Sequence, residues 1–372
     1  MSVRFLTAVS GRAFNMRDRF GREIDYMRIS VIDSCNLNCY YCNPQDNNKN
    51  CQAINILSVK KVLCIVRAAT RLGITHFRLT GGEPLLHPQI NEMVSQIKKI
   101  PGVRSVSLTT NAVLLAQHAK QLKEAGIDSI NVSLDTIDAS EYEHITKKPL
   151  LDKVEHGIDA AIECGIRVKI NAVLTPQTDV VALTRYASKK GTDIRFIEMM
   201  PVGEGHTNGV EPYEKVIGAL LEVYGSPCHI DTENREEINS GYNNADNGPA
   251  EYYSFHGLDI RVGLIQAIHG KFCDTCNRIR VTADGRLMPC LGSSVTMDLV
   301  PDSYEFTDDL EKDFVIVQAL KAAIKAKPGC HNFNDNAVTY TKTTETKTTE
   351  IETTELKAAE VNAARNMSRI GG

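Results

Sequence analysis

Two groups of three cysteines carry the clearest chemical signal in this chain of 372 residues. In the first group, Cys35, Cys39 and Cys42 are spaced C-x3-C-x2-C directly after the apolar run 27–32. Three thiolates at this spacing can hold three irons of a 4Fe-4S cluster and leave the fourth iron without a protein ligand. An open position on a metal centre is where a small molecule can bind and react. The pattern predicts a reactive iron-sulfur centre, and a zinc knuckle or three unrelated core cysteines are the alternatives.

The second group is Cys273, Cys276 and Cys290, spaced C-x2-C-x13-C. The segment between them is typical of a β-hairpin that turns at Asp284-Gly285. Arg278 and Arg280 alternate on its first strand, so both side chains point to the same face, beside the cysteines. Two guanidinium groups there would suit a triphosphate. This group predicts a second iron-sulfur cluster with an open iron, and the alternative is a zinc ribbon with Cys330 or His331 as its fourth ligand.

The composition limits the class of protein. Hydrophobic residues make up 42% and charged residues 24%, which is ordinary for a soluble globular chain. The formal net charge of -4 gives no sign of general nucleic-acid affinity. No apolar run approaches the roughly 20 residues that a membrane span needs, and we read no secretory signal. Six of the eleven cysteines fall in the two groups, which favours metal ligation in a reducing cytosol over disulfides. We expect a cytoplasmic protein that binds neither membranes nor nucleic acid.

The elements that must position these groups alternate in type. Helical stretches such as 58–72, with Ser58 as N-cap, are followed by short buried strands. Four helices are followed by a glycine suited to a left-handed C-cap, at Gly73, Gly126, Gly165 and Gly191. Such units build a parallel sheet with right-handed crossovers, and we prefer a partial barrel to an open doubly wound sheet. The predicted strands are 27–32, 76–79, 104–108, 129–133, 167–173 and 194–198.

The fold class predicted is α/β, a partial (βα)6 TIM-like barrel with a smaller C-terminal α+β domain that closes it. We assign residues 1–205 to the barrel with the first cluster, and 206–335 to the C-terminal domain with the second. Residues 336–366 contain three tandem Thr/Lys/Glu pentads, which cannot bury a core and predict a solvated insertion or a charged helix that runs into 356–365. Residues 367–372 form a tail that ends in Gly-Gly.

Polar groups follow the predicted strands at the end where a barrel carries its chemistry. Gly81-Gly82-Glu83 follows the second strand, and paired glycines let the main chain approach a ligand closely, although Gly-Gly alone is more often a tight turn. The other strands end in or carry the segments 109–111, 133–135 and 198–200, with Lys169 and Asn171 on the fifth.

These motifs are similar to those of known enzymes. The first triplet and the Gly-Gly segment resemble the radical S-adenosylmethionine enzymes. Nearly the whole chain resembles the GTP 3′,8-cyclase family, the first enzymes of molybdenum cofactor biosynthesis. The similarity lies in the segments 21–22, 28–30, 78–85, 109–111, 131–135, 195–198, 273–290 and 367–372.

The resemblance implies two 4Fe-4S clusters with S-adenosylmethionine as cofactor and GTP as substrate. Cleavage of S-adenosylmethionine at the first cluster would give a 5′-deoxyadenosyl radical, which takes hydrogen from ribose C3′ so that this carbon adds to guanine C8. The second cluster would bind guanine at its open iron. Implied S-adenosylmethionine contacts are Tyr41, Gly82, Ser133 and Met200. Implied GTP contacts are Arg28, Arg78, Thr109, Lys169, Arg278, Ile279 and Arg280.

The resemblance also implies a homodimer, an electron donor, and transfer of the product to cyclic pyranopterin monophosphate synthase. The terminal Gly371 and Gly372 would reach into the active site. The chain departs from the family pattern at Asn43, Ser34 and Ala112, where Met, Arg and Gly are usual. None of these is a predicted ligand, so we expect altered tuning and no loss of activity. The competing hypotheses are a radical S-adenosylmethionine peptide maturase and a non-catalytic zinc-binding scaffold.

Overall fold

The computed structural model describes residues 16–42, 54–201, 210–230, 248–293, 295–300, 304–306, 313–331 and 333. Through them runs one sheet, in the strand order β12-β11-β10-β1-β2-β3-β4-β5-β6-β9-β8-β7. Its centre is six parallel strands that pair in chain order, as predicted. They are β1 (Tyr26–Ser30), β2 (His76–Thr80), β3 (Ser105–Thr110), β4 (Ser129–Ser133), β5 (Arg167–Val173) and β6 (Asp193–Ile197).

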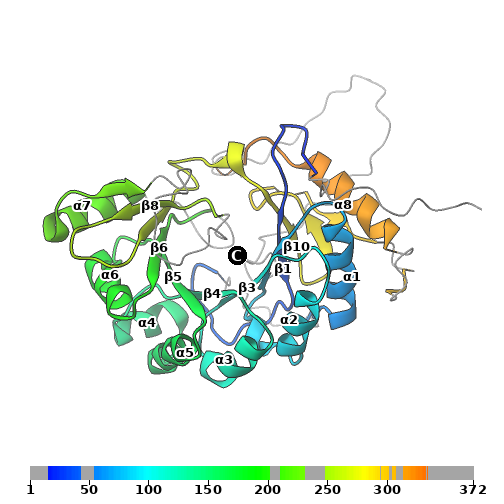
Figure 1. Ribbon diagram of the computed structural model, residues 1–372. Helices are drawn as coiled ribbons and strands as arrows, with labels where there is room; N and C mark the ends of the chain where they lie inside the picture. The colour runs from blue at the N-terminus through cyan, green and yellow to red at the C-terminus, as the bar shows by residue number, and fades with distance from the viewer. Residues whose placement is uncertain are drawn as a thin grey trace, which may run out of the picture.

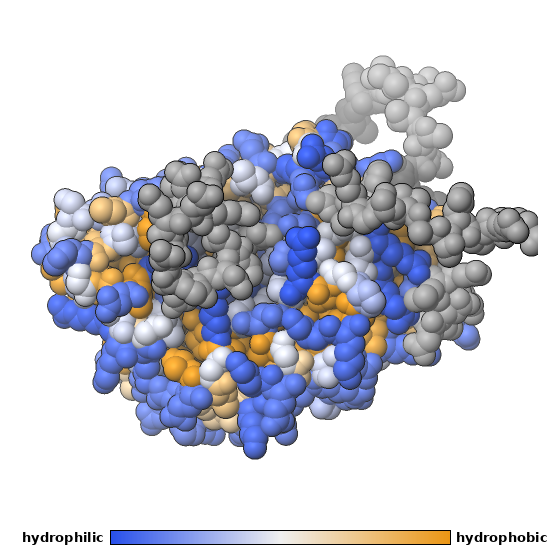
Figure 2. Space-filling model, viewed as in Figure 1, coloured by the Kyte–Doolittle hydropathy of each residue, from blue (hydrophilic) through white to orange (hydrophobic). Residues whose placement is uncertain are grey.

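Helices cover the outer side of this curved sheet (Figure 1). They are α1 (Val59–Thr70), α2 (Ile90–Lys98), α3 (Leu115–Glu124), α4 (Ala139–Thr146), α5 (Leu151–Glu163) and α6 (Val180–Lys189). In α1 the hydroxyl of Ser58 accepts a hydrogen bond from the amide of Lys61, and the stripe that includes Val62 and Ile65 is fully buried. The outward faces are mainly hydrophilic on the side shown in Figure 2. Each helix therefore buries one stripe against the sheet.

The predicted C-cap glycines all have positive φ. The angles are 85° at Gly73, 87° at Gly126, 67° at Gly165 and 63° at Gly191. Side chains with a Cβ rarely adopt this conformation, so glycine ends each helix and turns the chain into the next strand.

The C-terminal part of the chain widens this sheet at both edges. Strands β7 (Cys228–Ile230), β8 (Glu251–Ser254) and β9 (Val262–Ile265) extend it beyond β6, and β9 is parallel to β6. Strands β10 (Arg278–Val281), β11 (Arg286–Met288) and β12 (Met297–Asp298) extend it beyond β1, and β10 is parallel to β1. The predicted hairpin is present as β10–β11, with Gly285 at φ 85°. Strand β10, which follows Cys276, therefore pairs with β1, which precedes the first cysteine group.

Two helices complete the C-terminal part. They are α7 (Pro212–Tyr224) and α8 (Phe314–Ala326), and α8 packs against α1. The predicted boundary at 205, the insertion 336–366 and the tail 367–372 lie outside the described residues. Among the described residues, no helix is both long and apolar enough to cross a membrane.

Candidate active site

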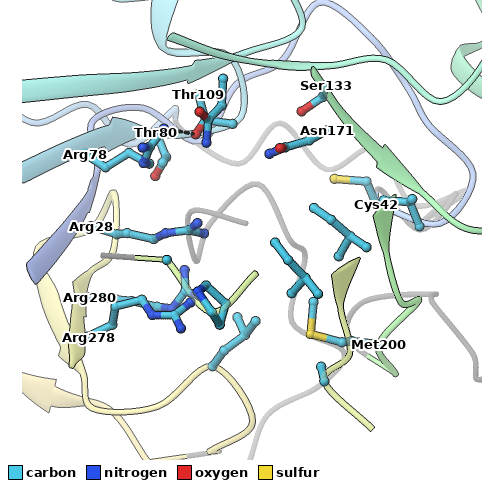
Figure 3. A pocket seen from close by; sticks show the side chains of 18 of the residues that line it. Arg28, Cys42, Arg78, Thr80, Thr109, Ser133, Asn171, Met200, Arg278 and Arg280 are labelled. Carbon is cyan, nitrogen blue, oxygen red and sulfur yellow. Dashed lines mark hydrogen bonds between the residues drawn. The ribbon is translucent and has the colours of Figure 1, made fainter. Parts of the chain in front are cut away.

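Both cysteine groups line a single cavity of about 310 Å³ on the inner side of the sheet. All six central strands contribute to its wall. In Figure 3, arginines extend into the cavity from one side, while Cys42 and Met200 lie on the other. The strands supply Arg28, Arg78, Thr109, Asn131, Ser133, Asn171 and Arg195.

The first cysteine loop is anchored by hydrogen bonds to the segments that follow β3 and β4. The hydroxyl of Tyr41 donates to the Asp135 carboxylate at 2.6 Å, and the amide of Val173 donates to the other carboxylate oxygen at 2.8 Å. The side-chain amide of Asn111 contacts the sulfur of Cys35 at 3.7 Å. The loop is thus held by residues after β3 and β4, and Asp135 is held in turn by β5.

The paired glycines let the loop after β2 lie directly on this cysteine loop. The amide of Gly82 donates to the carbonyl of Ile32 at 2.7 Å, and that of Glu83 to the carbonyl of Ser34 at 2.8 Å. A Cβ at Gly81 would come within 2.4 Å of the Ile32 oxygen, and one at Gly82 within 2.2 Å of the Ser34 oxygen. Only glycine permits this approach. Because Ser34 takes part through its main chain, its departure from the family pattern leaves the contact intact.

Buried carboxyl groups surround the first cysteine group. Glu83 is 1% exposed and accepts hydrogen bonds from the Thr110 hydroxyl and the Asn111 amide, both at 2.7 Å. Burial nevertheless raises its pKa to about 7. Burial, with a smaller contribution from the charge of Glu83, raises the pKa of Cys35 to about 11. Burial, and then the charge of Asp135, raises the pKa of the Cys39 thiol. These thiols are therefore protonated at neutral pH until a cation replaces the protons.

Two cations, Arg278 and Lys327, lie beside Cys276 in the second cysteine group. Cys273 lies on the short turn Cys273–Thr275, and Cys276 precedes β10. Burial raises the pKa of Cys276, but the nearby charges of Arg278 and Lys327 outweigh it and bring the pKa down to about 7. The ammonium group of Lys327 contacts the Cys276 sulfur at 3.4 Å. Cys276 thus lies beside positive charge, whereas burial raises the pKa of Cys273 to about 11, in the same direction as that of Cys35.

Arginines form a row across three neighbouring strands. Arg28 on β1 stands in register with Arg280 on β10 and with Arg78 on β2. Burial and then the charge of Arg280 lower the pKa of Arg28 well below its usual range. Among the described residues, Nη2 of Arg195 and Nε of Arg278 are buried without a hydrogen-bond partner. Buried donors of one charge sign are satisfied by an anionic ligand, and a polyphosphate would supply acceptors to several of them at once.

Most of the predicted site residues meet in this cavity, but two do not line it. Ile279 is 1% exposed and packs in the hydrophobic core, since it alternates with the inward-facing Arg278 and Arg280. Lys169 is also 1% exposed, with its ammonium group 3.9 Å from the Asp193 carboxylate and over the ring of Tyr252. The tail residues Gly371 and Gly372, with Asn43, lie outside the described residues. Those that line the cavity are Cys35, Cys39, Cys42, Cys273, Cys276, Cys290, Tyr41, Gly82, Ser133, Met200, Arg28, Arg78, Thr109, Arg278 and Arg280.

Sequence reasoning did not assign Arg195 to the site. Its guanidinium Nε donates to the side-chain oxygen of Asn171 at 2.9 Å, and it lines the cavity. The facing residue on β9 is Gly263, where a Cβ would come within 2.8 Å of the Arg195 side chain. The alternation of β6 contained the necessary signal, because it turns Arg195 inward in register with Asn171.

The donor sets fit iron-sulfur clusters. Each group brings three thiols to the cavity wall, where Cys39 feels the charges of Cys42 and Cys35, and Cys273 that of Cys290. Among the described residues, no three His, Cys, Asp or Glu side chains are arranged to hold a single metal ion. Of the two ligands suggested for a zinc ribbon, Cys330 is exposed next to Cys273, and both ring nitrogens of His331 face main-chain groups.

Comparisons with known proteins place the chain in a superfamily. Residues 29–184 match the Radical SAM superfamily model, and residues 192–333 match the model described as Molybdenum Cofactor Synthesis C. The crystal structure of Streptococcus suis SuiB bound to S-adenosylmethionine has a TM-score of 0.54 at 17% identity, covering 82% of this chain and 68% of that one. The SuiB structure bound to its precursor peptide SuiA gives 0.52. Fold and site together define a radical S-adenosylmethionine enzyme.

Curated relatives narrow this class. The GTP 3′,8-cyclase of Clostridium perfringens strain SM101 is 36% identical over 322 residues, which is 86% of this chain and 95% of that protein. The GTP 3′,8-cyclase of Listeria monocytogenes is 36% identical over 320 residues, 85% of this chain and 92% of that protein. The chain belongs to the GTP 3′,8-cyclase family.

Proposed function

We propose that this protein is a GTP 3′,8-cyclase, which converts GTP to (8S)-3′,8-cyclo-7,8-dihydroguanosine 5′-triphosphate in the first step of molybdenum cofactor biosynthesis. One observation carries the proposal. A single cavity joins two cysteine groups to an in-register row of arginines. The relatives over 86% of the chain bear the name of this activity.

The first cysteine group and its surroundings form the S-adenosylmethionine end of the cavity. When bound, a cluster on Cys35, Cys39 and Cys42 together with S-adenosylmethionine supplies a 5′-deoxyadenosyl radical. The loop of Gly82 offers main-chain groups to the amino acid part of the cofactor. Tyr41, Ser133 and Met200 line the same end of the cavity and would enclose the rest of the cofactor.

The arginines form the GTP end. Arg28, Arg78, Arg278 and Arg280 offer paired donors to the triphosphate, which holds the ribose between the two cysteine groups. Thr109 receives a contact at 3.5 Å from the Arg78 guanidinium and is within reach of the same ligand. Arg78 and Arg280 are each 6% exposed, so this end of the cavity is shielded from water during a reaction that passes through radicals.

The proposal also includes a second cluster, a homodimer and protein partners. Cys273, Cys276 and Cys290 would hold a cluster whose open iron receives guanine, and Gly371 and Gly372 would enter the same cavity. Lys169 would bind the nucleotide after its side chain moves away from Asp193. Ile279 would bind it through main-chain groups. The enzyme would act as a homodimer, draw on an electron donor, and pass its product to cyclic pyranopterin monophosphate synthase.

An anaerobic assay tests the proposal. Iron-reconstituted protein is mixed with dithionite, S-adenosylmethionine and GTP, and 5′-deoxyadenosine and the cyclised nucleotide are followed by chromatography. We expect both products, with the second lost in Arg278→Ala and in Gly372→Ala. Formation of 5′-deoxyadenosine with GTP left intact would keep the radical chemistry and overturn the substrate assignment.

A further inference from the structure

Lys327, just after α8, directs its ammonium group at the second cysteine loop. The side chain is 2% exposed. Its Nζ contacts the sulfur of Cys276 at 3.4 Å and donates to the carbonyl oxygens of Arg278 at 2.8 Å and Pro289 at 3.0 Å. These three partners account for the three N–H donors of an ammonium group. One side chain therefore ties together a cysteine, the residue before Cys290, and the strand of a cavity arginine.

Among the described residues, no carboxylate pairs with the ammonium group of Lys327. Within the part of the chain that the structure describes, its partners are a sulfur atom and two carbonyl groups. A buried cation in this position is stabilised when the atoms facing it become negatively charged, as ligating thiolates are. The geometry suits a centre that carries negative charge on its sulfurs.

A second buried cation, Arg22, supports the same loop but is charge-compensated. Its guanidinium donates to the carbonyl oxygens of Cys273 at 2.7 Å, Pro328 at 2.6 Å and Gly329 at 3.1 Å. It is also paired with the buried Asp18 at 2.6 Å. Arg22 thus ties Cys273 to the segment 328–329 by hydrogen bonds, but of these two cations only Lys327 adds positive charge next to a sulfur.

We propose that Lys327 is a positioning residue for the second cluster, which holds its loop and raises its reduction potential above that of the first cluster. This inference rests on the second cluster of the proposed function. Hydrogen bonds to cysteine sulfurs and local charge are main determinants of cluster potential. The first group is flanked instead by Asp135, whose carboxylate is held by Tyr41 and Val173 and whose negative charge opposes the addition of an electron. A donor too weak to reduce the first cluster would then still reduce the second.

The test isolates the second cluster in the full chain. Replacing Cys35, Cys39 and Cys42 with alanine gives a parent that should hold about four irons. Its potential is measured by EPR-monitored titration without GTP or S-adenosylmethionine. Lys327→Met in this parent should lower the equilibrium constant for reduction about tenfold, which is about 59 mV for one electron. Lys327→Arg keeps the positive charge, so its reduction potential should fall by less than half of the shift seen in Lys327→Met.

Two control variants separate charge from support. Lys325→Met removes an exposed lysine from the end of α8 and should change neither iron content nor potential. Arg22→Met removes loop support without removing uncompensated charge, so it should reduce iron retention and leave the potential of the retained cluster unchanged. If Lys327→Met loses its iron, the reduction potential is measured instead in Lys327→Gln, which lacks the charge but can still form hydrogen bonds.

Specific outcomes would overturn the inference. They are an unchanged potential in a fully loaded Lys327→Met, or an equal shift in Arg22→Met. A parent that binds no iron would instead remove the second cluster from the proposed function. Failure of the wild-type protein to act on GTP would leave the measured potentials, and hence the role of Lys327, unaffected.

Discussion

Arg28 and Arg280 stand in register on neighbouring parallel strands, β1 and β10, although they lie at opposite ends of the described chain. Arg78 stands on the other side of Arg28, so three like charges follow one another across the sheet. Burial and mutual repulsion both disfavour the charged state of Arg28. Without an anion this row destabilises the folded protein, and a polyphosphate reverses the sign of its contribution.

Replacement of Arg28 by methionine should therefore separate binding from stability. We expect Arg28→Met to weaken GTP binding by about 10- to 100-fold, because it removes a charged hydrogen-bond partner of the triphosphate. The same change should raise the unfolding midpoint of the ligand-free protein by about 2 °C, since it removes a repulsive buried charge. Calorimetry with GTP and thermal unfolding without it measure the two effects. Arg185→Met, at an exposed position on α6, is the control, and a lowered midpoint in Arg28→Met would contradict this account.

The buried carboxyl group of Glu83 should make stability depend on pH. Its folded-state pKa of about 7 lies above the ordinary value of 4.5, so the folded protein binds this proton more tightly than the unfolded chain. Its contribution is fully present below pH 4.5 and is lost as the pH rises to 7, by about 2 to 3 kcal/mol. Glu83→Gln cannot ionise and should show a flatter decline of the unfolding midpoint over this range. An equal change in the exposed Glu124→Gln, or the same slope in Glu83→Gln, would argue against the assignment.

Local signals in the sequence were sufficient for the barrel. The strand positions and the four C-cap glycines follow from alternation and from the conformational freedom of glycine, which are properties of neighbouring residues. The sequence did not indicate that residues 228–298 would extend the sheet at both edges, because strand pairing between distant segments leaves no local pattern. The same limit applies to Lys327 and Arg22, which meet the second cysteine group only after the chain has folded.

The alternation of side chains along a strand explains where the observed site differs from the predicted one. Arg278 and Arg280 face the cavity as predicted, and the same alternation turns the side chain of Ile279 into the core. The departure at Ala112 also has a local explanation. Its φ is 63°, a conformation that glycine adopts without strain, and the usual glycine of the family suits this angle better than alanine. The sequence shows that the residue type differs, and the structure shows that alanine here has a backbone angle better suited to glycine.

The hydroxyl of Tyr41 should be needed to hold the first cysteine loop. Tyr41→Phe removes the 2.6 Å hydrogen bond to Asp135 and leaves a partly buried carboxylate with one donor fewer. We expect affinity for S-adenosylmethionine to fall about tenfold, the effect of about 1.4 kcal/mol. Equilibrium binding to the iron-loaded protein provides the measurement. Tyr40→Phe is the matched control because Tyr40 is 40% exposed and contacts Tyr41 only by its ring. Equal affinities in the two variants would show that the hydroxyl of Tyr41 is dispensable.

A methyl group at Gly82 should separate the two loops that build the first cluster site. The added Cβ would lie 2.2 Å from the Ser34 carbonyl oxygen and 2.7 Å from that of Asp33, so main-chain atoms would have to move. We expect Gly82→Ala to destabilise the protein by about 3 kcal/mol and to lower the iron held by the first cysteine group. Denaturant unfolding and iron analysis test this. Gly218→Ala, in the middle of α7 where a Cβ meets nothing within 4 Å, is the control. It should stabilise the protein by about 0.5 to 1 kcal/mol, because alanine favours the helix. Wild-type iron content in Gly82→Ala would mean that the two loops need not touch for the cluster to bind.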